Sequence, residues 1–385
     1  MSEWKKVKLG EITIIKTGKL DSNAAVPNGA YPFFTCDPTT LSIDKWAYDT
    51  EAILLAGNNA SGNYTAKYYK GKFNAYQRTY IIETLNPQFA SVRYMAYAMN
   101  QQLQLLKVMS SGSTTKFLTM KMLTQLSIDL PSIETQNRIA TILSRYDSLI
   151  ENYQKQIKLL EEAAQRLYKE WFIDLRFPGH ENTKIVDGIP EGWEKKKVGD
   201  VCDTIGGGTP STKVQEYYEG GNISWVTPTD ITRNNSLCLL STEKKITQEG
   251  LDHSSAKMLP EETILMTSRA SVGYFGICDF EVCTNQGFIS CVPFQKNFQM
   301  YLLYNLINRV GEIRIKAGGS TYLEISKSVF RNFDIISPSD DILNSFQYKV
   351  HKILDEVRYL SKQIRHLTEA RDRLLPKLMS GEINV

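Results

Sequence analysis

Two segments of this chain carry apolar residues that alternate three and four positions apart. In the first segment these positions hold Ile139, Leu143, Tyr146, Ile150, Tyr153, Ile157, Leu160, Ala164, Leu167 and Trp171. In the second, the same spacing runs through Phe346, Val350, Ile353, Val357, Leu360, Ile364, Leu367, Arg371, Leu374 and Leu378. A heptad pattern kept over about five heptads is typical of helices that pair as a coiled coil. The pattern therefore predicts two long helices.

The two predicted helices match in length and spacing, so each is the natural partner of the other. We expect the pairing residues to be Ile139, Leu143, Ile150, Ile157, Leu160, Leu167, Val350, Ile353, Val357, Leu360, Ile364, Leu367 and Leu374. About 40 residues at 1.5 Å each give a rod of roughly 60 Å, which would hold two globular domains apart. The alternative is that each stripe packs on its own domain. Arg371, which stands where the first stripe has Ala164, would mark a solvated edge or set the register.

Both helices belong to a longer internal repeat. With the chain shifted by 207 residues, Gly112-Ser113-Thr114 falls on Gly319-Ser320-Thr321 and Lys155-Gln156-Ile157 falls on Lys362-Gln363-Ile364. The beginnings of the two copies also match, at a slightly different offset: Trp4-Lys5-Lys6-Val7 resembles Trp193-Glu194-Lys195-Lys196-Lys197-Val198. The period is far too long for a solenoid. The sequence therefore predicts a duplicated unit of one globular domain followed by one helix.

The regions before the helices lack helical periodicity at their starts, and we predict mixed α/β domains there. Short β-prone runs alternate with turns rich in Gly, Asn and Ser. The predicted strands are Glu11 to Ile15, Ala52 to Leu55, Thr79 to Ile82, Leu126 to Leu130, Thr263 to Met266, Gly273 to Ile277 and Phe288 to Pro293. Helices are predicted at Val92 to Met109 and at Met300 to Ile315. The globular domains would span residues 1–131 and 179–338, and the helical spacers residues 132–178 and 339–385.

Composition narrows the class of protein. The 385 residues suit two or three domains, and 42% hydrophobic residues are enough to build their cores. No apolar run approaches the roughly 18 to 20 residues of a membrane span, and the first residues lack a signal-peptide core. We therefore expect a soluble, cytoplasmic protein. The six cysteines form no C-x-x-C pair, which favours reduced, structural thiols over a zinc site.

The charge is unevenly distributed between the two halves. Residues 1–130 carry 14 Lys and Arg against 9 Asp and Glu, whereas residues 181–339 carry 16 against 19. The whole chain has a formal net charge of only +3. Any nucleic acid bound by the second domain must therefore be held by a local basic face rather than by bulk charge.

Loops in both domains carry side chains suited to DNA. Asn, Gln and Arg can read base edges, while Ser, Thr, Lys and backbone amides hold phosphates. In the first domain the candidates are Asn58, Asn59, Tyr64, Tyr76, Gln77, Arg78, Ser113, Thr114 and Lys116. In the second they are Gly208, Thr209, Ser211, Lys213, Ser268, Arg269, Asn285, Gln286, Ser320 and Thr321. The alternative is that these are ordinary turn residues.

Signatures of catalysis are missing from the sequence. There is no G-x-x-x-x-G-K-[ST] motif, and the run Gly206-Gly207-Gly208-Thr209 lacks the spacing of a dinucleotide site. The N/D-P-P-Y/F/W tetrapeptide of amino-methyltransferases is absent as well, and the four histidines are not paired at metal-ligand spacing. We expect no catalytic residue and no metal. A DNA-binding scaffold that recruits enzymes is therefore favoured over an enzyme.

Several motifs resemble those of type I restriction-modification specificity (S) subunits. In the second half they are Gly207-Gly208-Thr209-Pro210-Ser211-Thr212, Trp225-Val226-Thr227-Pro228-Thr229-Asp230-Ile231 and Ser268-Arg269-Ala270-Ser271-Val272-Gly273-Tyr274. Phe73-Asn74-Ala75-Tyr76-Gln77-Arg78 in the first half resembles another subtype, and the tail Leu374-Leu375-Pro376-Lys377-Leu378 resembles the usual C-terminus of these subunits. The resemblance covers nearly the whole chain and adds Thr227 and Tyr274 to the candidates.

The resemblance implies two target-recognition domains separated by two antiparallel helices. Each domain would read one half of an interrupted, bipartite double-stranded DNA site, and the helices would set the gap. It also implies two methyltransferase (modification) subunits that use S-adenosylmethionine for adenine N6 methylation, and restriction subunits that use ATP. Those cofactors would belong to the partners, so none is expected in this chain. The alternative from another class is a structural scaffold that joins protein partners without reading DNA.

Overall fold

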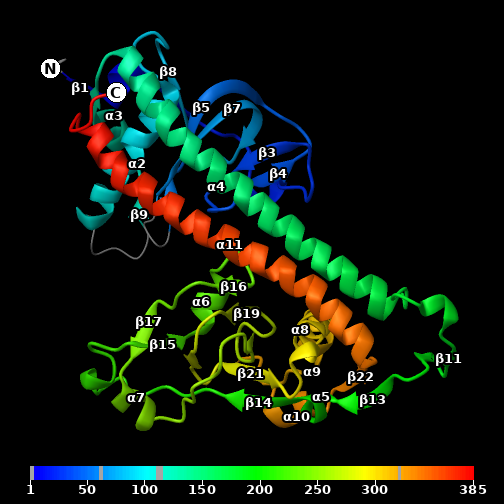
Figure 1. Ribbon diagram of the computed structural model, residues 1–385. Coiled ribbons are helices and arrows are strands. Elements are labelled where there is room, and N and C mark those ends of the chain that lie inside the picture. The colour runs from blue at the N-terminus through cyan, green and yellow to red at the C-terminus, as the bar shows by residue number, and fades with distance from the viewer. Residues whose placement is uncertain (1–3, 60–63, 110–115, 320–321) are drawn as a thin grey trace. The chain divides into compact units, whose positions relative to one another are not determined.

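The computed structural model describes residues 4–59, 64–109, 116–319 and 322–385. The chain forms two compact units, Met1–Leu149 together with Leu367–Val385, and Ile150–His366. Figure 1 shows the two long helices, α4 (Ile133–Tyr168) and α11 (Asp340–Met379), each of which contributes residues to both units. Within the described residues, no helix is both long and apolar enough to cross a membrane.

Unit 1 is a mixed α/β domain built on a six-stranded sheet of order β2-β8-β5-β7-β3-β4. The β-prone runs in β5 and β8 are buried on both faces of the sheet: Ile53, Leu55 and Ile82 belong to one hydrophobic core, and Ala52, Leu54 and Ile81 belong to another. Besides parts of α4 and α11, its elements are β1 (Lys5–Lys8), α1 (Leu9–Ile12), β2 (Thr13–Thr17), a 3-10 turn (Ser22–Ala24), β3 (Tyr31–Phe34), β4 (Leu41–Ile43), β5 (Tyr48–Ala56), β6 (Asn58–Asn59), β7 (Ala66–Ala75), β8 (Thr79–Thr84), α2 (Val92–Met109), β9 (Lys116–Phe117), α3 (Met120–Gln125) and β10 (Ser127–Leu130).

Unit 2 has a five-stranded sheet of order β14-β21-β18-β19-β16 and a three-stranded sheet of order β17-β15-β20. After α4 come a π-helical turn (Lys169–Ile173), a 3-10 turn (His180–Asn182), β11 (Ile185–Val186), β12 (Ile189–Pro190), β13 (Glu194–Lys197), α5 (Val198–Val201), β14 (Cys202–Gly206) and a 3-10 turn (Gln215–Tyr217). Next are β15 (Ile223–Val226), α6 (Pro228–Thr232), β16 (Cys238–Leu239), β17 (Lys244–Ile246), α7 (Gln248–Asp252), β18 (Ile264–Thr267), β19 (Phe275–Cys278), β20 (Cys283–Thr284) and β21 (Phe288–Pro293). The rest are a 3-10 turn (Lys296–Phe298), α8 (Gln299–Asn308), α9 (Val310–Lys316), α10 (Lys327–Arg331) and β22 (Asp334–Ser337).

The two units repeat the same architecture. In both, the sheet begins with the strand after the first short helix (β2 or β14) and continues in the equivalent order, β8-β5-β7 in unit 1 and β21-β18-β19 in unit 2. Tyr94 donates a hydrogen bond to the Asp129 carbonyl at 2.7 Å, and Tyr301, 207 residues later, donates one to the Ile336 carbonyl. The strand order is therefore repeated in both units, and this buried bond is repeated at the predicted offset of 207 residues.

The predicted helix Val92 to Met109 has the bounds of α2. Its counterpart is broken into α8 and α9 at Arg309, which has a ψ of 14° rather than a helical value. The Arg309 guanidinium donates to Glu312 at 2.8 Å and also to the Asp334 carbonyl, and Gly311, a poor helix former, follows two residues later. The bond to Asp334 reaches 25 residues along the chain, a contact that the apolar pattern does not register.

Both apolar stripes face inward along their whole length. Every position of either stripe is buried or half-buried. Ile139 and Leu143 belong to the core of unit 1, whereas Ile157 and Ala164 belong to the core of unit 2. The opposite division holds for α11, whose first half packs in unit 2 and whose end, with Leu378, packs in unit 1. Each globular core is thus completed by half of each long helix.

The long helices also contact each other within each unit. In unit 2 the ring of Tyr168, the last residue of α4, lies 6.2 Å from the ring of Phe346 on α11, and the rings of Trp171 and Phe172 in the following π-helical turn lie 5.8 Å and 4.9 Å from it. In unit 1 the Arg371 Nη1 of α11 donates to the Asp147 Oδ1 of α4 at 2.7 Å. Arg371 therefore has an ionic partner on the facing helix, where the sequence left open a solvated edge or a register device.

Candidate nucleic-acid interface

The candidate loops of unit 1 meet at one end of its six-stranded sheet. The Gly57 N–H, just after β5, donates to the Arg78 carbonyl in the turn between β7 and β8 at 2.7 Å. The Gly57 carbonyl in turn accepts from the Leu118 N–H at 2.9 Å, and Asn58 pairs with Phe117 in the β6–β9 ladder. Three loops that are far apart in the sequence are thereby tied together by backbone bonds.

Unit 2 builds the same framework from different residues. The Ser268 N–H donates to the Gly287 carbonyl at 2.8 Å, and the Ser268 carbonyl accepts from the Ile325 N–H at 3.0 Å. Arg269, the next residue, forms a backbone bridge with Glu324, as Asn58 does with Phe117 in unit 1. Because the bonds are between main-chain atoms, side chains can change here without altering the framework.

A glycine lies at the same point of both frameworks. A Cβ on Gly18 would lie 2.1 Å from the Ala75 carbonyl oxygen, and one on Gly207 would lie 2.1 Å from the Asn285 carbonyl oxygen. A Cβ atom cannot come so close to an oxygen, so only glycine fits where the chain passes these carbonyl groups. The sequence singled out Gly207 but missed Gly18. The signal for it is the 189-residue offset between Trp4 and Trp193, which also relates the two glycines.

Both units expose some of the candidate DNA-binding side chains. Gln77 and Arg78 are exposed in unit 1, and Asn58, Tyr64 and Tyr76 are half-buried. In unit 2, exposed side chains are those of Thr209, Ser211, Lys213, Arg269, Tyr274 and Gln286, while Asn285 and Thr227 are half-buried and Gly208 and Ser268 are buried. Ser113, Thr114, Ser320 and Thr321 lie outside the described residues. For Asn59 and Lys116 the described part is the backbone, in β6 and β9.

Contacts among the unit 2 candidates show which of them the fold brings together. The Thr209 hydroxyl donates to the Gln286 side-chain carbonyl, and the Gly208 N–H donates to the Thr284 carbonyl at 2.9 Å. Arg269 Nε lies 3.7 Å from a Glu324 carboxylate oxygen. Thr227 has a different role: its hydroxyl donates to Asp230 at 2.7 Å, and the residue caps α6. Its side chain is therefore used within the fold.

Two polar clusters attach the globular parts to the long helices, one in each unit. In unit 2, Arg358 Nη2 donates to Glu262 at 3.1 Å, and His351 Nε2 lies 3.0 Å from the same carboxylate. Burial raises the pKa of Glu262, but the charges of His351 and Arg358 outweigh it and hold the pKa below its usual range. In unit 1, Tyr97 donates to the Asp147 carboxylate that also binds Arg371.

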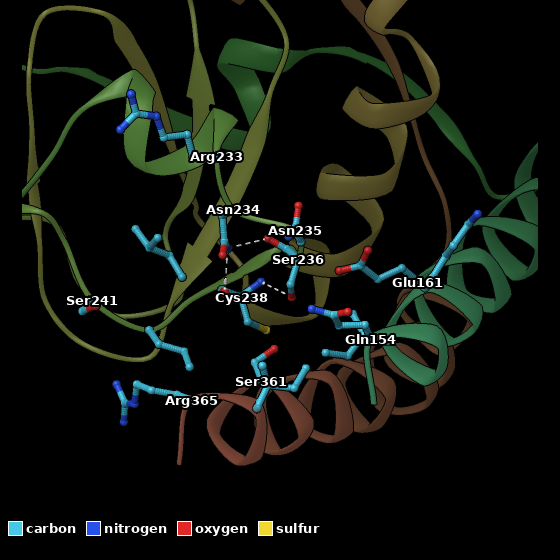
Figure 2. Close-up of a pocket in the computed structure, with 15 residues that line it drawn as sticks. Gln154, Glu161, Arg233, Asn234, Asn235, Ser236, Cys238, Ser241, Ser361 and Arg365 are labelled. Carbon is cyan, nitrogen blue, oxygen red and sulfur yellow. Dashed lines mark hydrogen bonds between the residues drawn. The ribbon is translucent and has the colours of Figure 1, made fainter. Parts of the chain in front are cut away.

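A pocket of about 540 Å³ lies within unit 2, between α4, α11 and the segment 233–241 (Figure 2). Ile157, Leu239 and Ile364 are among the apolar residues of its lining. Glu161 points toward the segment and accepts the Leu237 N–H at 2.7 Å, and burial raises the pKa of its carboxyl. None of the DNA candidates that the structure describes lines this pocket, which is formed by the long helices and the segment 233–241.

Thiols and metal ligands add no further site. All six cysteines are free, and burial raises the pKa of Cys238, Cys278 and Cys283 to about 12. Such thiols remain protonated at neutral pH and are poor nucleophiles. Over the residues that the structure describes, no group of three or more His, Cys, Asp or Glu side chains could hold a metal ion.

Comparison with known proteins identifies the family. Residues 1–162 and 190–369 match the type I restriction modification DNA specificity domain. The chain is 34% identical over 224 residues to the type I restriction enzyme EcoDI specificity subunit of Escherichia coli, a match that covers 52% of this chain and 49%, about half, of that relative. It is 31% identical over 305 residues to the MjaIX specificity subunit of Methanocaldococcus jannaschii, covering 76% of this chain and 68% of that protein.

A solved structure has a similar fold. The crystal structure of a type I restriction-modification system S subunit from M. genitalium matches with a TM-score of 0.62, over 98% of this chain and 96% of that chain, at 17% identity. Together with the domain match along most of the sequence, this likeness of fold agrees with two mixed α/β domains and long helices. The chain belongs to the type I restriction modification DNA specificity family.

Proposed function

We propose that this chain is the DNA-reading subunit of a type I restriction-modification complex and recognises an interrupted, bipartite sequence. Each unit reads one half-site with the three-loop end of its sheet. The observation that carries the proposal is the shared backbone framework, Gly57–Arg78–Leu118 in unit 1 and Ser268–Gly287–Ile325 in unit 2. Two domains that recognise different DNA sequences require the same backbone framework with different exposed side chains.

The exposed side chains have the chemistry of base readout. Arg78 and Gln77 stand together in the β7–β8 turn, and Arg269 and Gln286 stand on adjoining loops of unit 2. Arg is the usual partner of guanine in the major groove and Gln of adenine. Gln77 and Gln286 occupy equivalent positions, whereas Arg78 and Arg269 lie on different loops of the framework. The two half-sites should therefore differ in sequence.

In this proposal the helices α4 and α11 pair as an antiparallel coiled coil, set the gap between the half-sites and carry two methyltransferase subunits. Each apolar stripe packs partly in the core of unit 1 and partly in the core of unit 2, which supports a fixed attachment of each globular domain to the helices. Methylation at adenine N6 with S-adenosylmethionine and translocation with ATP are assigned to the partner subunits, and this chain contributes specificity without catalysis. Restriction subunits join the same complex.

Sequencing of methylated adenines in the host, with and without this gene, tests the proposal. We expect one split N6-methyladenine motif, with two different half-sites, to disappear on deletion. An unchanged methylome would contradict DNA reading. Mobility shift of the purified complex on that motif, at a stated salt concentration, then separates a reader from a scaffold that merely joins protein partners, because a scaffold would not discriminate between duplexes.

A further inference from the structure

Each unit exposes an aromatic side chain beside its candidate reading loops. In unit 1 it is Phe117, which is 57% exposed and is the cross-strand partner of Asn58. In unit 2 it is Tyr322, which is 60% exposed and lies two residues before Glu324, the residue that bridges Arg269. Single exposed apolar residues are common on protein surfaces. Two aromatic residues at the corresponding edges of two divergent domains indicate a shared use.

Backbone hydrogen bonds hold residues next to both aromatic side chains. Gly318 and Glu324 exchange two backbone hydrogen bonds, of 3.0 and 2.8 Å, and the Leu323 carbonyl accepts from the Ala270 N–H at 2.8 Å. In unit 1, Phe117 lies in the β6–β9 ladder, and the Leu118 carbonyl accepts from the Tyr80 hydroxyl at 2.8 Å. A ring presented by a fixed backbone loses little conformational entropy when it meets a ligand.

The identity of the ligand follows from how the two sites differ. Phe117 corresponds in the repeat to Glu324, and Tyr322 corresponds to Thr115, so the aromatic residues are not copies of each other. A surface that bound the same protein partner on both units would be expected to keep its side chains. Instead the aromatic residue changes together with the polar reading residues next to it, Asn58 in unit 1 and Arg269 in unit 2. That covariation points to DNA, which differs between the two half-sites.

We propose that Phe117 and Tyr322 are wedge residues that press their rings between base steps at the two half-sites and loosen base stacking there. The inference rests on the DNA-reading function proposed above and adds a mode of DNA deformation to it. Apolar side chains that enter a groove beside polar contacts partly unstack the bases and kink the duplex. An enzyme that modifies a base has to take that base out of the stack, so a reader that weakens stacking lowers the work of extrusion.

The test uses the complex of this chain with its methyltransferase subunit. The probes are a duplex of about 30 base pairs carrying the split motif from the methylome and two further duplexes, each with an abasic site opposite the target adenine of one half-site. An abasic partner removes pairing and part of the stacking in advance. The variants are Phe117→Ala and Tyr322→Ala, with Phe117→Tyr and Tyr322→Phe as conservative replacements. Phe294→Ala, 58% exposed and just after the end of β21 that is remote from Gly287, is the matched control.

Each alanine variant should bind the intact duplex roughly 5- to 140-fold more weakly, the equivalent of about 1–3 kcal/mol for one stacked base. Most of that loss should disappear on the duplex with the abasic site in its own half-site, while the control and the conservative variants bind like the wild type. Permanganate reactivity of thymines next to the wedge should fall in the alanine variants.

Three results would overturn the wedge. Equal losses on intact and abasic duplexes would make the ring an ordinary contact, and unchanged binding would remove it from the interface. Failure of an alanine variant to co-purify with the methyltransferase subunit would assign the ring to a protein interface. If the wild-type complex does not prefer the intact motif to unrelated DNA, the proposed function itself fails, and this outcome is visible before any variant is compared.

Discussion

The ion pair between Asp147 and Arg371 gives a quantitative prediction. Its repeat counterparts in unit 2 are Leu354 and Ala164, both buried and apolar. Tyr97, which donates to Asp147, corresponds to the buried Tyr304. The same place in the fold is therefore polar in unit 1 and apolar in unit 2. We predict that Arg371→Ala destabilises unit 1 and that adding Asp147→Leu, which copies unit 2, restores most of the stability.

The magnitude follows from the partial burial of the pair. The two side chains are 28% and 33% exposed, and the Nη1–Oδ1 distance is 2.7 Å. Exposed ion pairs contribute about 0.2–1 kcal/mol, and loss of one partner of a fully buried pair costs about 3–5 kcal/mol. Arg371→Ala leaves the Asp147 carboxylate half-buried with the Tyr97 hydroxyl, so the cost should be about 1–3 kcal/mol. The double variant should lie within about 1 kcal/mol of the wild type, because an apolar pair leaves no charge unpaired.

Hydrogen exchange in urea is the suitable assay, because peptides from α2 and from the unit 1 sheet report on unit 1 alone. Whole-chain melting would mix two units and is not two-state. Lys377→Ala, on the part of α11 that belongs to unit 1, with a side chain 51% exposed and paired with Glu382 at 3.3 Å, is the matched control and should change little. A double variant no more stable than Arg371→Ala would show that the unpaired Asp147 carboxylate is not the source of the loss, and the reasoning would fail.

Four further expectations follow from other features. The fold lowers the pKa of Glu262 below its ordinary value of 4.5, so the ion pairs of Glu262 stabilise unit 2 fully above about pH 4.5. This stabilisation is lost as the pH falls through the lowered pKa. In Glu262→Gln, the free energy of unfolding of unit 2 should therefore depend less on pH in this acid range. Gly207→Ala should abolish specific DNA binding, since its Cβ meets a main-chain oxygen at 2.1 Å, whereas Gly311→Ala, with open space around it, should not. Arg78→Ala should weaken cognate DNA binding by about 1–3 kcal/mol in a mobility shift at controlled salt. Unaltered affinity would show that Arg78 does not contact the bases. Seven residues inserted into both helices at the unit boundary should lengthen the methylated gap by about 3 base pairs, from 1.5 Å per residue and 3.4 Å per base pair, and an unchanged gap would rule out the helices as the ruler.

The sequence predicted well what depends on local periodicity. The apolar stripes lie on α4 and α11, the span of α2 was predicted correctly, and the strand Phe288 to Pro293 has the bounds of β21. These elements are determined by residues near one another in the chain. The break at Arg309 was not predicted, because it depends on a bond to the Asp334 carbonyl, which the pattern of apolar residues does not register.

The candidate interface was harder to predict because backbone atoms from distant segments bring its loops together. Asn58, Arg78 and Arg269 were chosen from residue type and from their place in loops or beside β-prone runs, and the bonds that bring their loops together leave no pattern in the sequence. Ser268 and Thr227 carry the same chemistry but are buried or occupied by Asp230. Gly18 was missed because its partner in the repeat lies 189 residues away, not 207. Small insertions change the offset between the two copies, so a comparison at one fixed offset misses such equivalent residues.

The division of α4 and α11 between the two cores has a consequence for synthesis on the ribosome. Unit 1 contains Met1–Leu149 and also Leu367–Val385, so its core lacks Leu378 and Met379 until all of unit 2 has been translated. Unit 2 is continuous and has all its residues earlier. At roughly 5–20 residues per second, the N-terminal domain waits on the order of 10–40 s for its last helical turns. During that time the core of unit 1 stays incomplete, and a stop codon within α11 would damage a unit whose sheet was made before unit 2.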